Sequence, residues 1–142
     1  FKAQAGDYIT DVFTDHAIDF IERHASSEQT KPFMLYLPYT APHEPLHGKP
    51  ADLKKLFPES FAERSDASII NEMDGHAFRR ASVQMKAYHY AAMVYNMDLG
   101  IGRILDTLKA QGIEDNTLII FTCDNGALME SRVRRVLSRC KH

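Results

Sequence analysis

Asp124, Asn125 and Gly126 form a short polar segment that could bind a metal ion. The carboxylate and the amide carbonyl are hard oxygen donors of the kind that calcium and magnesium prefer. Gly126 lets the backbone turn sharply enough to direct both donors toward one point. The same triplet is also an ordinary turn sequence, and on spacing alone the turn is several times the commoner interpretation.

His43 is the second candidate, because it lies in a loop between Pro42 and Pro45. Two prolines restrict the backbone on either side of the imidazole. A histidine held in this way could bind an anion or protonate a leaving group. A single loop histidine is more often an ordinary surface residue, so its neighbours in the fold must decide between the two interpretations.

Both loops follow segments that have the pattern of buried strands. Residues 33–37 form a nearly continuous apolar run bounded by Pro32 and Pro38, and residues 117–122 form a second run rich in β-branched residues. In open α/β sheets, ligands bind in the crevice beyond the carboxyl ends of parallel strands. The pattern therefore predicts that His43 and Asp124 lie close together at one edge of a sheet.

Helices are predicted between these strands. Apolar residues at helical spacing predict one helix over residues 11–24 and a longer one over residues 81–110, with Gly112 placed to end it. Residues 40–77 hold four of the 6 prolines, which predicts a long irregular excursion with room for one short helix. The order of helix, strand, helix and strand predicts an α/β fold, with part of a mostly parallel sheet flanked by helices.

The composition fits one folded domain and argues against nucleic acid and membranes as partners. The 142 residues are 44% hydrophobic, enough for a single core, and 17 Lys plus Arg against 19 Asp plus Glu leave a formal charge of -2. No nucleic-acid partner is expected from such a balance. No membrane segment is expected either, because no apolar run approaches the about 18 to 20 residues that span a bilayer. Cys123 and Cys140 form neither a disulfide framework nor a zinc-like cluster.

Four separated motifs occur in the order in which the sulfatase family has them. They are residues 8–15, 31–46 with the sequence Pro42-His43-Glu44-Pro45, 90–105, and 115–126 with the sequence Asp124-Asn125-Gly126. Each motif alone is weak, but four in the same order are a strong signal. Over residues 8–126 the chain resembles an internal piece of a calcium-dependent, arylsulfatase-like enzyme of the alkaline-phosphatase-like superfamily.

The resemblance implies hydrolysis of sulfate esters with calcium as cofactor. In the family, the histidine of the Pro-His-x-Pro loop contacts the sulfate ester and helps the bridging oxygen leave, which implies that role for His43. The Asp-Asn pair of the second loop supplies two calcium ligands, which implies Asp124 and Asn125. A cation there would neutralise the sulfate oxygens during attack at sulfur. Family members work in secretory, lysosomal or periplasmic space, so one of these compartments is expected.

The nucleophile of the family has no counterpart in this sequence. It is a formylglycine made within a Cys/Ser-x-Pro-Ser-Arg-like segment, which lies upstream of every motif matched here. Ser60 begins a looser Ser-x-Ala-x-Arg match, but it follows His43 and lacks the proline, so we interpret it as coincidence. We expect residues 1–126 to form a partial sulfatase catalytic domain and residues 127–142 a basic tail unlike the family. The chain alone is expected to be inactive.

Two other functions remain compatible with these residues. One is a metal-dependent phosphoester or phosphonate hydrolase of the same superfamily, in which the His43 loop serves another anion. The other is a non-catalytic role, as a truncated product or a binding partner. The segment that carries the nucleophile would distinguish the two enzymes. A Cys-x-Pro-x-Arg sequence upstream and in frame would show that the chain is a fragment, as opposed to a non-catalytic product.

Overall fold

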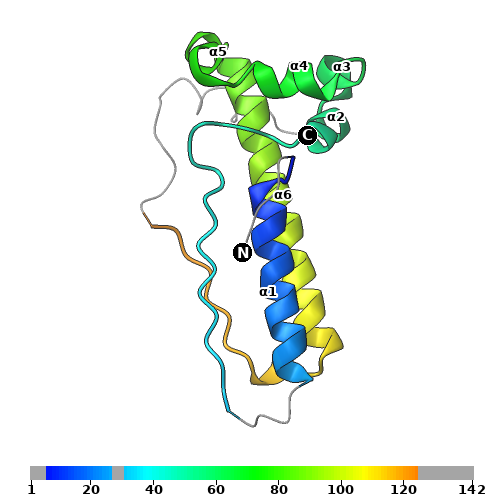
Figure 1. Cartoon of the computed structure of the whole chain (residues 1–142), viewed down its shortest axis with the longest axis vertical. Helices are drawn as coiled ribbons and strands as arrows, with labels where there is room; N and C mark the ends of the chain where they lie inside the picture. Colours follow the sequence, from blue (N-terminus) through cyan, green and yellow to red (C-terminus); the bar gives the residue numbers. More distant parts are fainter. Residues whose placement is uncertain (1–5, 27–30, 125–142) are drawn as a thin grey trace. The chain divides into compact units, whose positions relative to one another are not determined.

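The computed structural model describes residues 6–26 and 31–124 of the chain (Figure 1). These residues form helices joined by irregular segments, and no β-strand occurs among them. The elements are α1 (Ile9–Ala25), α2 (Pro50–Leu56), α3 (Pro58–Phe61), α4 (Asp66–Asn71), α5 (Gly75–Arg80), α6 (Val83–Ala110) and the 3-10 turn η1 (Glu114–Asn116). Within the same ranges, no helix is both long enough and apolar enough to cross a bilayer.

The predicted α/β fold, with part of a mostly parallel sheet flanked by helices, is wrong for the described residues. The two predicted strands, residues 33–37 and 117–122, run as irregular chain without strand pairing. Their apolar side chains are also not buried, since Met34 is 89% exposed and Leu118 is 85% exposed. A strand forms only when a neighbouring strand takes up its backbone N–H and C=O groups. The apolar pattern indicates that these side chains favour strand conformation, but it does not show whether a neighbouring strand is present.

The helix predictions fared better. The helix predicted over residues 11–24 is confirmed as α1, and the one predicted over 81–110 is confirmed as α6. Residues 40–77 are more helical than predicted, because they contain α2, α3, α4 and the start of α5. Pro50 and Pro58 each stand at the first position of a helix. Proline is compatible with that position because its missing N–H has no partner within the helix.

The chain divides into two compact units. Among the described residues, the first takes in residues 6–26, residues 31–41 and Asn96–Phe121, and the second takes in Pro42–Tyr95 and residues 122–124. In the first unit, α1 packs against the later part of α6 (Figure 1). The buried face of α1 consists of Thr10, Thr14, Ala17 and Ile21, which recur at helical spacing. This unit holds the predicted strand 33–37 and all but the last residue of the predicted strand 117–122.

The second unit has an apolar core beneath the short helices, which gather around the start of α6 (Figure 1). Four side chains that are 0% exposed make this core, one each from α2, α3, α4 and α6: Leu53, Phe61, Ile69 and Ala92. The ring of Tyr88 meets that of Phe61 edge to face at 5.7 Å between centroids. The core therefore joins the helices that follow the His43 loop to one side of α6.

Gly100 of α6 is expected to be intolerant of alanine. A Cβ at Gly100 would lie 2.5 Å from Thr14 Oγ1. That hydroxyl is hydrogen-bonded to the carbonyl of Thr10 at 2.9 Å and to the hydroxyl of Tyr39 at 2.7 Å, so it cannot move away freely. We expect Gly100→Ala to lower the free energy of unfolding by about 1–3 kcal/mol, as overpacking does. Urea denaturation followed by circular dichroism measures the change.

Gly102 provides the matched control, because it lies on the same helix and a Cβ there would meet nothing within 4 Å. Gly102→Ala should raise the free energy of unfolding by up to about 1 kcal/mol through helix propensity. Two variants with the same gain in stability would contradict the close approach of α1 and α6 at Gly100.

Candidate functional site

His43 lies in the loop that precedes α2, and its side chain is exposed. The ring nitrogen Nδ1 is 2.6 Å from the backbone carbonyl oxygen of Glu44. A carbonyl oxygen can only accept, so Nδ1 carries the proton and donates this hydrogen bond. Nε2 is then the ring nitrogen that can meet a ligand. The loop thus presents an imidazole whose orientation is set by its own backbone.

The other end of the same loop is held against the helices of the second unit, to which the loop itself belongs. Leu46 is 6% exposed, and His47 Nε2 lies 3.5 Å from Asp74 Oδ1 at the start of α5. The backbone N–H of Gly48 donates to Nδ1 of His89 at 3.0 Å. The loop therefore presents an exposed histidine, and three consecutive residues at the loop's C-terminal end, Leu46 to Gly48, are fixed by contacts.

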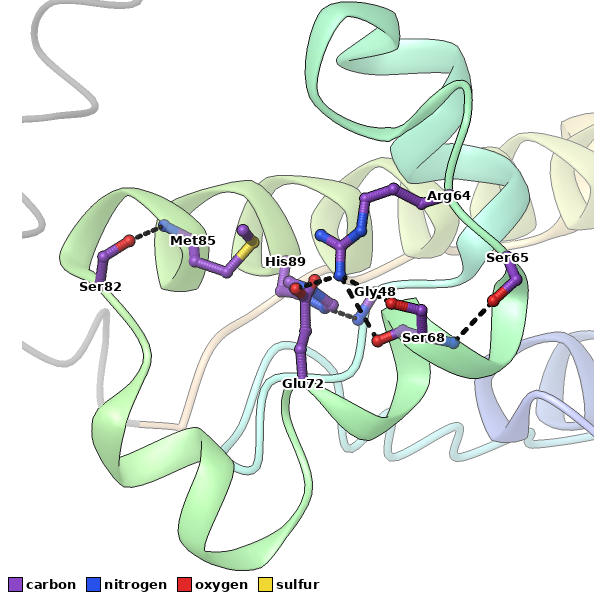
Figure 2. A network of polar contacts seen from close by, with 8 residues as sticks. All are labelled: Gly48, Arg64, Ser65, Ser68, Glu72, Ser82, Met85 and His89. Carbon is purple, nitrogen blue, oxygen red and sulfur yellow. Dashed lines mark hydrogen bonds and ion pairs between the residues drawn. The ribbon is translucent and has the colours of Figure 1, made fainter.

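His89 is the centre of a polar network inside the second unit (Figure 2). Its side chain is 1% exposed, and its Nε2 lies 2.9 Å from Glu72 Oε1. The other carboxylate oxygen of Glu72 pairs with Arg64 at 2.6 Å. Burial lowers the pKa of His89 below its ordinary value, and this outweighs the hydrogen bond and the charge of Glu72, which act to raise it. His89 is therefore neutral near pH 7.

Sequence reasoning missed His89, because no metal or catalytic motif surrounds it. A signal was nevertheless present in its position on α6, four residues after Met85 and three before Ala92, both of which pack in the core of the second unit. A histidine on the buried face of a helix needs hydrogen-bonding partners. The partners themselves, Glu72 and Gly48, are distant in sequence and could not be named from it.

Asp124 is the last described residue, and it is exposed. Its predicted partner Asn125 lies outside the described residues. The predicted proximity of this pair to His43 therefore stays a prediction. Cys123, beside Asp124, is also exposed.

Within residues 6–26 and 31–124, no group of three or more His, Cys, Asp or Glu side chains is arranged to hold a metal ion. The proposed ligands Asp124 and Asn125 have the right donor chemistry for calcium, a carboxylate and an amide carbonyl. They supply two donors, whereas calcium takes 6 to 8 oxygen ligands. By donor chemistry alone, the two residues are suited to supply part of a calcium site and not a whole one.

The last residue of the Ser-x-Ala-x-Arg match that begins at Ser60 has a structural role. Ser60 is exposed on α3, and Arg64, the arginine of the Ser-x-Ala-x-Arg match, pairs with Glu72. The guanidinium of Arg64 also lies over the ring of Phe61 at 5.3 Å. These contacts account for Arg64 without a role in forming a nucleophile.

The chain is similar to known sulfatases along most of its length. The family model described as Sulfatase matches residues 2–139. An uncharacterized sulfatase of Escherichia coli, YdeN, is 36% identical over 129 residues, which cover 91% of this chain and 19% of that protein. An uncharacterized sulfatase of Schizosaccharomyces pombe is 32% identical over 146 residues, covering 84% of this chain and 26% of that protein.

An arylsulfatase of Klebsiella aerogenes is 29% identical over 126 residues, which cover 72% of this chain and 27% of that protein. The chain thus spans about a fifth to a quarter of the length of these relatives. No solved structure matches it.

Proposed function

Because this chain belongs to the sulfatase family, we propose that it forms part of the catalytic domain of a calcium-dependent enzyme that hydrolyses sulfate esters. The observation that carries the proposal is the His43 loop. It has the Pro-His-x-Pro sequence, it lies inside the matched range, and it presents an exposed imidazole with Nδ1 bonded to Glu44.

His43 serves in this proposal as the contact to the sulfate ester. With Nδ1 donating to a carbonyl oxygen, a proton on Nε2 can be directed at the bridging oxygen of the ester. As the bond between sulfur and that oxygen breaks, the oxygen gains negative charge and the proton moves onto it from Nε2. After this proton transfer His43 is a neutral imidazole, and its Nδ1 still donates to the carbonyl oxygen of Glu44.

Asp124 and Asn125 would hold the calcium ion. When bound, the ion supplies positive charge that neutralises the sulfate oxygens. The carboxylate of Asp124 and the amide oxygen of Asn125 provide two of its ligands, so the remaining donors come from other parts of the protein. The formylglycine nucleophile also comes from outside these 142 residues, because no segment of the sequence matches its maturation motif.

The test is hydrolysis of a chromogenic aryl sulfate by the full-length protein that carries this segment and a formylglycine sequence. We expect kcat/KM for the aryl sulfate to exceed that for the matching aryl phosphate by at least about 100-fold. Removal of calcium with a chelator should abolish turnover, and added calcium should restore it. Preference for the aryl phosphate would overturn the proposal in favour of a phosphoester hydrolase. An inactive full-length protein that carries formylglycine would favour a non-catalytic role.

A further inference from the structure

The backbone at Gly48 lies directly on α6. A Cβ at Gly48 would be 2.9 Å from the Cβ of Ala92 and 3.2 Å from the Cα of His89. Any side chain at this position would separate the loop from the helix. The approach brings the N–H of Gly48 to Nδ1 of His89, five residues after the exposed His43.

The hydrogen bonds of His89 determine its protonation. The N–H of Gly48 can only donate, so Nδ1 of His89 accepts and carries no proton. Nε2 then carries the proton and donates to the carboxylate of Glu72 at 2.9 Å (Figure 2). Arg64 balances the charge of that carboxylate. A neutral imidazole in one tautomer thus joins the base of the loop to the end of α4.

We propose that His89 is a positioning residue for His43, because its unprotonated Nδ1 holds Gly48 on α6 and so fixes the base of the loop that carries His43. The proposal rests on the proposed function for the role of His43. The anchor itself, between His89 and Gly48, does not depend on that function.

The anchor is sensitive to pH in a defined direction. Protonation of Nδ1 would place two donors face to face and break the contact with Gly48. Glu72 from the end of α4 favours the charged ring, whereas burial and the charges of Arg64 and His47 disfavour it. The pKa of His89 is lowered in the folded state, so the anchor is fully present above about pH 6.5, the ordinary value, and is lost as the pH falls through the lowered pKa.

Two substitutions of His89 separate its two hydrogen bonds. In His89→Asn the side-chain oxygen can take the place of Nδ1 and accept from Gly48, whereas in His89→Gln the longer amide reaches the place of Nε2 and Glu72 instead. In the 142-residue chain, we expect hydrogen exchange at the Gly48 amide to be at least about tenfold faster in His89→Gln than in His89→Asn. Equal exchange rates at Gly48 in the two variants would overturn the anchor.

The unsubstituted chain provides a second measurement that does not depend on variant folding. The 15N spectrum of the imidazole should show Nδ1 of His89 unprotonated and Nε2 protonated at pH 7. A proton on Nδ1 at that pH would also overturn the proposal.

The positioning role of His89 is tested by measuring kcat and KM of its variants in the full-length protein. We expect His89→Gln to lower kcat for an aryl sulfate about 10- to 100-fold with a smaller change in KM, and His89→Asn to retain most of the rate. Equal kcat values in the two variants would leave the anchor standing and refute its role toward His43. If the unsubstituted full-length protein hydrolyses no aryl sulfate, the proposed function fails, and the exchange and 15N results still decide the anchor.

Discussion

Replacing His43 by alanine should lower kcat for an aryl sulfate by about 10²–10⁴-fold in the full-length protein that carries this segment, the range that a positioned general acid contributes. The reason lies in the geometry of the loop, where Nδ1 donates to the carbonyl of Glu44 and leaves Nε2 for the ester oxygen. Alanine removes both the proton and the contact to sulfate. Steady-state kinetics with a series of aryl sulfates measures the loss, which should be largest for phenols of high pKa, because these need the proton most.

His76→Ala is the matched control for this experiment. His76 is an exposed histidine on α5, and no sulfatase motif surrounds it. Its replacement should leave kcat within about twofold of the parent protein, and both variants should keep the stability of the parent, as exposed positions usually do. A His43→Ala enzyme with unchanged kcat across the series would refute the assignment of His43 as the proton donor.

Phe61→Ala should have the largest effect on stability, lowering the free energy of unfolding by about 3–5 kcal/mol. Phe61 is 0% exposed. Its ring packs edge to face with that of Tyr88, and the guanidinium of Arg64 lies over it. Truncation leaves a cavity among Leu53, Ile69 and Ala92. These side chains come from three different helices, so they cannot all move inward to fill it. Urea denaturation of the 142-residue chain measures the loss as a shift of the unfolding midpoint.

Phe121→Ala removes the same side chain from an exposed position. Phe121 is 74% exposed, so its truncation should change the free energy of unfolding by less than about 0.5 kcal/mol. Equal midpoints for the two alanine variants would show that Phe61 is not part of a packed core. A large loss in Phe121→Ala would instead show that the segment after η1 is buried in solution.

Local features of this protein could be predicted from its sequence. The apolar spacing around Phe20 and Ile21 was sufficient to predict α1, and the stripe from Val83 to Leu108 was sufficient to predict α6. Helical hydrogen bonds join residues that are close in sequence, so the pattern contains most of what a helix requires. The family could be recognised for a similar reason, since the order of its motifs is a property of the sequence itself.

Features that depend on distant partners were decided only by the tertiary structure. The runs at 33–37 and 117–122 have strand composition, yet strand pairing needs a neighbour that the described residues do not provide. The prolines between residues 40 and 77 indicated a break, whereas two of them begin helices that the core around Phe61 holds in place. His89 had no motif, and its role depends on Gly48 and Glu72, which lie 41 and 17 residues away. Sequence alone determined the family and the local helices, because both depend on residues close together or in fixed order. The pairing of segments and the partners of buried polar groups depend on contacts that only the folded chain brings together.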